Sequence, residues 1–158
     1  MTPAPAGAAS LDHIALTALL QRPRIRRLLA ALDRDGEETR IVGGAVRNAL
    51  LGRPVTEVDF TTTALPDITT RRAEAAGLKA VPTGIEHGTV TVVVDGEPFE
   101  VTTLREDVET DGRHAVVRFG RDFAADARRR DFTINALSLG ADGRLYDYTG
   151  GEADLGAR

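Results

Sequence analysis

Two groups of residues that could act together on a phosphate lie within one short stretch, RIVGGAVRNALLGRPVTEVDFTTT. Gly43 and Gly44 precede an apolar segment with helical spacing, so backbone N–H groups and the absence of Cβ atoms would let an anion approach closely. Arg47 follows about one helical turn later, where its guanidinium could bind the same anion. Glu57 and Asp59 alternate in a segment with strand character. This order predicts a phosphate site beside a pair of carboxylates.

The acid pair in turn predicts a metal site. Residues two apart on a strand point to the same face, with Cα atoms roughly 6–7 Å apart. Glu57 and Asp59 could therefore bind two Mg²⁺ ions, which would align an attacking hydroxyl and a leaving pyrophosphate. Each pattern alone also has a simpler interpretation, because a glycine pair often forms an ordinary turn and alternating acids often form a solvated strand face.

The elements that must position these residues form a body of mixed strands and helices. TRIVG and VTEVDFTTT predict strands, while AVRNALLG and LPDITTRRAEAAG predict helices that end at Gly52 and Gly77. GTVTVVVDGEPFEVTTLR predicts two strands joined at its Asp-Gly pair. AADARRRDFTINALSLG passes from a helical turn into a strand, and GRLYDYTGG adds a final short strand. We expect a mixed β-sheet.

Three further segments complete the organisation. Residues 1–9 are rich in Ala, Pro and Gly and are predicted to be a disordered tail. Residues 10–38 form a helical preface, with Ser10 as N-cap and Pro23 separating two short helices. Within the body, residues 105–122 carry charges and glycines without a burial period, so we expect a mobile loop there.

Composition excludes several classes of protein. The chain has 158 residues, 42% of them hydrophobic and 28% charged, as in a folded globular domain. Its formal charge of −4 excludes a uniformly basic nucleic-acid surface, and its lack of cysteine excludes disulfides, thiolate nucleophiles and cysteine-bound zinc. Walker A, dinucleotide-binding and GxSxG motifs are missing, and the three histidines show no metal spacing. With neither a signal segment nor an apolar run of about 18 residues, we expect a cytoplasmic protein without a membrane partner.

A family resemblance adds to these patterns. It rests on six segments in order: VGGAVRNALLG, EVDFTTT, GIEHGTVTV, FEVTTLR, DGRHAVVRFG and RRRDFTINALSL. They resemble the head region of class II tRNA nucleotidyltransferases, the CCA-adding enzymes, and their poly(A) polymerase relatives. The resemblance covers residues 39–158 and implies a polymerase-beta-like nucleotidyltransferase head of α+β class, a central mixed sheet flanked by helices and preceded by short N-terminal helices. It also implies Mg²⁺-dependent, template-independent transfer of nucleotides from CTP or ATP to the 3′-hydroxyl of tRNA.

The resemblance assigns roles to particular residues. It implies that the Gly43–Gly44 pair and Arg47 hold the triphosphate, and that Arg130 and Asp131 contact the phosphates and ribose. The run of arginines that ends at Arg130 could equally be a solvated surface.

The acids receive roles in the same way. Glu57 and Asp59 fall on the family's metal-binding, catalytic carboxylates. Glu100 is a candidate third catalytic acid that would orient the 3′-hydroxyl, although an edge-strand glutamate in solvent is as common. Residues 111–113 match the family's flexible segment.

Two departures from the family pattern bear on activity. Glu57 and Asn48 stand where the family usually has Asp. Because Mg²⁺ tolerates little error around ligand distances of about 2.0–2.1 Å, the extra methylene of Glu57 could displace a metal ion. A displacement of about 1 Å can cost on the order of 100-fold in rate. With these departures, three states of the site are open: fully active, slower than the family's, or without catalytic activity.

The family's template for choosing CTP or ATP, and its tRNA-binding surfaces, lie on helical domains beyond the head. We therefore expect the sequence to be a fragment of a longer enzyme, or a stand-alone head that works with a partner chain carrying those domains. Two other interpretations stay open: a nucleotide-binding or assembly module with little turnover, and a poly(A) polymerase.

Overall fold

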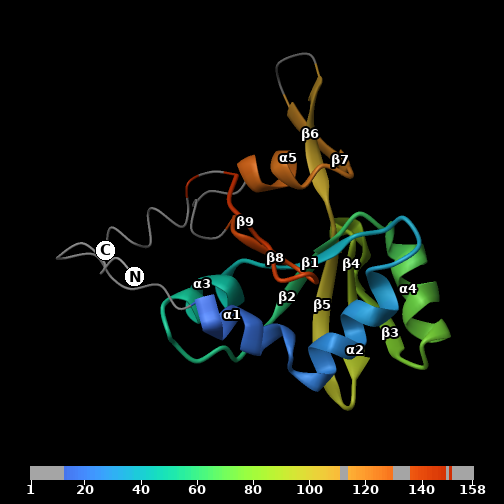
Figure 1. Cartoon of the computed structure of the whole chain (residues 1–158). Helices are drawn as coiled ribbons and strands as arrows, with labels where there is room; N and C mark the ends of the chain where they lie inside the picture. Colours follow the sequence, from blue (N-terminus) through green and yellow to red (C-terminus); the bar gives the residue numbers. More distant parts are fainter. Residues whose placement is uncertain (1–12, 111–113, 130–135, 149, 151–158) are drawn as a thin grey trace.

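The structure is a computed structural model that describes residues 13–110, 114–129, 136–148 and 150. The expected tail at residues 1–9 lies outside the described residues. Figure 1 shows a central β-sheet flanked by helices. The helices are α1 (His13–Leu20), α2 (Pro23–Leu32), α3 (Gly44–Leu50), α4 (Pro66–Ala75), α5 (Phe123–Arg128) and the 3₁₀ turn η1 (Ile85–His87). The strands are β1 (Thr39–Val42), β2 (Asp59–Thr62), β3 (Lys79–Gly84), β4 (Thr89–Val94), β5 (Glu97–Thr103), β6 (Arg105–Thr110), β7 (His114–Phe119), β8 (Ser138–Gly140) and β9 (Leu145–Tyr146).

The main sheet has seven strands in the order β3-β4-β5-β2-β1-β8-β9. β2 and β5 run parallel, whereas the other neighbouring strands of this sheet run antiparallel. The expected mixed sheet is therefore confirmed. β4 and β5 join through Asp95 and Gly96, whose φ angles of 48° and 82° fit the hairpin turn that the sequence predicts.

The core lies between one face of this sheet and the helices. Successive residues of β4 alternate between buried and half-buried positions, as expected for a strand with one face covered. α2 and α4 pack on that covered face, and α1 packs on α3. Phe60 and Phe99 meet edge to face inside this layer, with ring centroids 5.9 Å apart. Among the described helices, none is long and apolar enough to cross a membrane.

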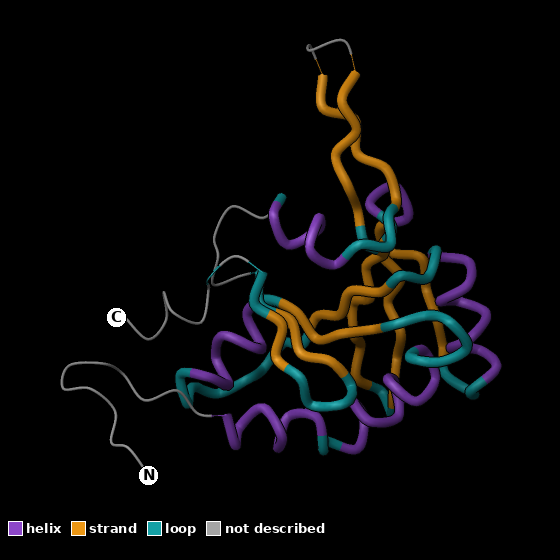
Figure 2. Tube along the Cα trace, turned by 45° about the horizontal axis from the view of Figure 1, so that its top comes forward, coloured by secondary structure: helices purple, strands orange, loops and turns teal. Residues whose placement is uncertain are grey.

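The segment expected to be a loop is instead largely a two-stranded ribbon, β6–β7, which projects from the body (Figures 1 and 2). Glu106 and Arg118 face each other across it, with 2.6 Å between Oε1 and Nε. Two strands that do not join the main sheet lack its buried face, so the sequence carries no regular burial pattern to predict them. Residues 111–113, between the strands, lie outside the described residues. β3 was also not predicted, since Pro82 interrupts it at the sheet edge.

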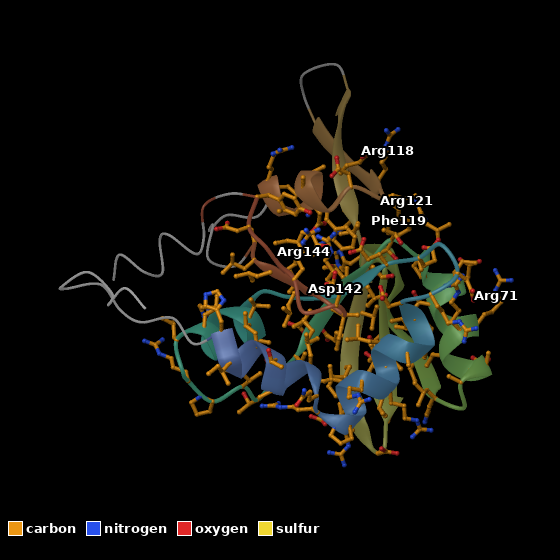
Figure 3. The ribbon with its side chains drawn as sticks, in the orientation of Figure 1. Arg71, Arg118, Phe119, Arg121, Asp142 and Arg144 are labelled. Atoms are coloured by element: carbon orange, nitrogen blue, oxygen red, sulfur yellow. The ribbon has the colours of Figure 1, made fainter. Side chains whose placement is uncertain are left out.

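Side chains at the end of β7 fix the base of the ribbon (Figure 3). The Phe119 ring occupies the space that a Cβ on Gly88 would need. Arg121 follows, and its Nη1 donates to Glu37 Oε1 at 2.9 Å and to the Thr63 carbonyl at 3.3 Å. These contacts join the ribbon to the body and to the loop that links α2 to β1.

Candidate active site

The glycine pair lies where β1 passes into α3. Gly43 has φ 76° and ψ −132°, a conformation that residues with a Cβ rarely adopt, and its N–H donates to the Leu137 carbonyl at 3.2 Å. Arg47 folds back over the glycines, because its Nη2 lies 3.3 Å from the position that a Cβ on Gly44 would take. α3 has only seven residues, so its dipole adds little to the predicted anion site. The close backbone and the Arg47 guanidinium are the features that could bind phosphate.

The acid pair lies at the start of the next strand of the sheet. Glu57 is not part of a strand, since β2 begins at Asp59, and the prediction that both acids share a strand face is wrong in this respect. The physical reason is that residues 53–58 leave α3 as an irregular segment before they reach the sheet. Both carboxylates are nevertheless exposed and line one depression of about 380 Å³. That depression is lined by Thr56, Glu57, Val58, Asp59, Thr91, Glu97, Pro98, Phe99 and Glu100.

Glu100 also lines this depression, from the neighbouring strand. In the parallel register Asp59 is the partner of Glu100, so the two residues lie side by side on the same face of the sheet. β5 lies between β4 and β2, which excludes the interpretation of Glu100 as an edge-strand glutamate. The sheet therefore brings the predicted third acid to the predicted pair.

Sequence reasoning missed two polar residues of this depression, Thr91 and Glu97. Thr91 is the β4 partner of Glu100, a neighbour that only the strand register reveals. Glu97 pairs with Arg24 of α2, with 3.4 Å between Oε2 and Nη1. This pairing neutralises the charge that Glu97 would otherwise add to those of Glu57, Asp59 and Glu100.

The carboxylates suit a hard cation chemically, since Mg²⁺ prefers oxygen ligands. Among the described residues, however, no three acidic or histidine side chains form a group that could hold a metal ion. Glu57 and Asp59 are thus the pair that fits Mg²⁺ by donor type, with Glu100 beside them.

Asn48 connects the glycine segment to the acid segment. Its Oδ1 accepts from Arg47 Nε at 3.1 Å, and its Nδ2 donates to the Pro54 carbonyl at 3.3 Å. Pro54 lies three residues before Glu57 in the chain. The position where the family usually has Asp therefore holds Arg47 through a neutral acceptor and also contacts the backbone that leads to the acids.

α5 carries the start of the arginine run. Asp122 caps it, since its Oδ1 accepts from the N–H groups of residues 124 and 125 at 2.9 and 3.3 Å. Asp126 is buried, and its Oδ1 accepts from the Arg105 N–H at 3.0 Å, which ties α5 to the first residue of the ribbon. Arg128 ends the helix, and Arg129 follows as its C-cap. Arg130 and Asp131, the predicted nucleotide contacts, lie outside the described residues.

These features together define a polymerase-beta-like nucleotidyltransferase head. They are the acids that adjacent strands bring to one depression, the glycine–arginine segment beside them, and the mixed sheet backed by helices. The sequence profile of the family described as Poly A polymerase head domain matches residues 39–158. The chain belongs to this family.

Individual relatives agree with this assignment. The chain is 52% identical over 119 residues to the mitochondrial CCA tRNA nucleotidyltransferase 1 of Danio rerio, and 40% identical over 137 residues to the CCA-adding enzyme of Bacillus cytotoxicus. These alignments cover 75% and 85% of the chain, but only 28% and 34% of the relatives. The chain thus spans about a third of the length of these proteins.

Solved structures give the same result for the fold. The crystal structure of the Bacillus stearothermophilus CCA-adding enzyme in complex with CTP superposes with a TM-score of 0.71 at 37% identity, over 85% of this chain and 32% of that one. A tRNA nucleotidyltransferase complexed with a primer tRNA and an incoming ATP analog superposes with a TM-score of 0.59 at 32% identity, over 76% of this chain and 34% of that one.

Proposed function

We propose that this chain is the catalytic head of an enzyme that adds nucleotides from CTP or ATP to the 3′-hydroxyl of tRNA and releases pyrophosphate. The observation that carries the proposal is the convergence of Glu57, Asp59 and Glu100 on one depression, in a chain of this family. The named activities of the relatives, and the CTP and primer tRNA in the two solved complexes, support the choice of substrates.

Each part of the site has a role in this proposal. Glu57 and Asp59 would hold Mg²⁺, which would stabilise charge on the reacting phosphate. Gly44 allows the triphosphate close to the backbone, and Arg47 binds it through its guanidinium. Glu100, beside Asp59, orients the attacking hydroxyl. The arginine run and Asp131 complete the nucleotide contacts.

The division of the whole chain follows from the same proposal. Residues 39–158 are the head, residues 10–38 a helical preface and residues 1–9 a tail. The helical domains that select the base and bind the rest of the tRNA are supplied by further sequence or by a partner chain. A cytoplasmic location stays a prediction from the sequence.

Titration calorimetry with CTP tests the site directly. We expect binding that depends on Mg²⁺ and is lost when a chelator replaces it. Asp59→Ala should abolish the Mg²⁺ dependence, whereas Arg47→Ala should weaken binding by about 10–100-fold, the equivalent of losing one charged hydrogen bond of about 1.5–3 kcal/mol. Asp67→Ala and Arg71→Ala are matched controls, because this exposed ion pair lies on α4. Arg71 is labelled in Figure 3. If the Asp59 and Arg47 variants bind like the parent, the nucleotide site is elsewhere.

The second candidate, a nucleotide-binding or assembly module with little turnover, is favoured by Glu57, which departs from the family's usual Asp. Glu57→Asp discriminates between the two functions. An increase in nucleotide incorporation supports the enzyme, while unchanged, negligible incorporation with intact CTP binding supports the module. Comparing CTP and ATP incorporation in the same assay, with the helical domains that select the base also present, separates CCA addition from poly(A) polymerase activity.

A further inference from the structure

Arg40 is a buried charge that the proposed site does not use. It lies in β1 with only 5% of its surface exposed. Its guanidinium carbon lies 3.6 Å from the ring centroid of Phe123 in α5 and 3.4 Å from that of Tyr146 in β9. The two rings thus hold the guanidinium between a helix and a strand that are distant from β1 in the sequence. Tyr148 stacks on Tyr146, with ring centroids 6.0 Å apart.

Polar partners satisfy the same guanidinium. Nε donates to Glu38 Oε2 at 2.6 Å, and Nη1 donates to the Tyr148 hydroxyl at 3.0 Å. Burial alone would lower the pKa of Arg40, but the hydrogen bonds to Glu38 and Tyr148 and the charge of Glu38 outweigh it, so its pKa is raised above the usual value. Arg40 therefore stays charged at every working pH and can hold both aromatic rings throughout.

This cluster lies on the face of the sheet that carries the acids. Arg40 is the register partner of Thr61, and Val42 is the partner of Asp59, so Arg40 and Asp59 point to the same side. Tyr146 reaches that side through its partner Ser138, which pairs with Val42. The helices α2 and α4 occupy the opposite side, which buries residues such as Phe60. Phe123 therefore brings α5 over the acid-bearing face by packing on Arg40.

We propose that Arg40 is a positioning residue for nucleotide binding: its stack on Phe123 holds α5, which ends at Arg128, over the face of the sheet that carries Asp59. This inference rests on the proposed function. Arg40 need not touch the nucleotide in this role, because it acts through Phe123. A purely structural Arg40 would affect the stability of the fold but not the affinity for nucleotide.

The two tyrosines of the chain, Tyr146 and Tyr148, provide a direct readout, since both belong to the cluster. With tyrosine rings selectively labelled with ¹³C, their NMR signals report on the cluster and on nothing else in the protein. If α5 links Arg40 to the nucleotide, CTP with Mg²⁺ should shift these signals in the parent. In Arg40→Met the shift on adding CTP should be lost, because the connection between the cluster and α5 is broken.

Affinity is measured in the same series by titration calorimetry with CTP and Mg²⁺. Arg40→Met and Phe123→Leu should each weaken CTP binding by about tenfold, as expected when a binding group is misplaced by a fraction of an ångström, and Arg40→Lys should restore part of the affinity. Phe123→Leu keeps the Arg40–Glu38 ion pair, so it still tests the proposal if Arg40→Met does not fold. Leu28→Ala is the matched control: it leaves a cavity in the buried layer of α2, and should lower stability while CTP affinity stays within about twofold.

The outcomes separate the two proposals. If the parent does not bind CTP, the proposed function is refuted and this inference with it. If the parent binds CTP but the Arg40 and Phe123 variants bind equally well, or the tyrosine signals do not respond to CTP, only the inference is refuted. Loss of affinity in Leu28→Ala to the same extent would also refute it, because the effect would then follow from stability alone.

Discussion

The two adjacent glycines should respond in opposite ways to substitution by alanine. Gly43 has φ 76° and ψ −132°, so a Cβ there strains the backbone by about 1–3 kcal/mol. Gly44→Ala places a residue with higher helix propensity in the first position of α3, so we expect little loss of stability. Its Cβ would, however, lie 3.3 Å from Arg47 Nη2, so the guanidinium would have to shift by a few tenths of an ångström. One substitution should therefore damage the fold and the other the site.

Urea denaturation and calorimetry measure the two effects separately. Gly43→Ala should lower the free energy of unfolding by about 1–3 kcal/mol, which for a chain of this size lowers Tm by about 2–4 °C per kcal/mol. Gly44→Ala should unfold like the parent but bind CTP about tenfold more weakly, the equivalent of about 1.4 kcal/mol, close to that of one weak charged hydrogen bond. A Gly43→Ala variant as stable as the parent would refute the backbone argument. Unchanged CTP affinity in Gly44→Ala would refute the role of Arg47.

Three further predictions concern activity, tRNA and the ribbon. Glu57→Asp should raise nucleotide incorporation, measured by primer extension with Asp67→Glu as control, and a decrease would show that the local backbone is adapted to the longer side chain. Residues 1–158 alone should bind tRNA weakly and with a steep dependence on salt in gel-shift assays, while tight, selective binding would contradict the assignment of tRNA contacts to other domains. Limited proteolysis should first cut between the two strands of the ribbon, near Arg113, once cleavage in the N-terminal tail is set aside, and CTP with Mg²⁺ should protect this site. First cleavage in GTVTVVV would count against this prediction.

The parts of the fold that could be predicted from the sequence are those with a local signal. The hairpin at Asp95–Gly96 follows from a dipeptide that favours positive φ, and α3 and α4 follow from helical spacing and from glycines beyond their ends. The ribbon β6–β7 was missed because it does not join the main sheet and so lacks a regular burial pattern. Strand order carries no comparable local signal, and that is why the position of Glu100 beside Asp59 needed the structure.

The candidate site divides in the same way. Gly44, Arg47, Glu57 and Asp59 could be predicted, because their residue types and spacing lie within one short stretch. The strand assignment of Glu57 failed, since residues 53–58 form an irregular segment and β2 begins only at Asp59. Arg40 did carry a signal, because it is the one charged residue of β1, the strand TRIV that precedes the glycines. Its aromatic partners, however, come from segments more than 80 residues away. Such contacts depend on tertiary packing, which cannot be predicted from any short stretch of the sequence.

Asn48 shows how the two halves of the site depend on each other. An Asp at this position would offer Arg47 a charged acceptor, but it would have no N–H to donate to the Pro54 carbonyl. Compared with an Asp, Asn48 therefore has a weaker electrostatic interaction with Arg47. In exchange it donates a hydrogen bond to the segment that leads to Glu57. The longer Glu57 side chain stands on that same segment. Because the two departures from the family pattern meet at this backbone, their effects on metal and triphosphate binding should be coupled, and Asn48→Asp and Glu57→Asp combined should differ from the sum of the single changes.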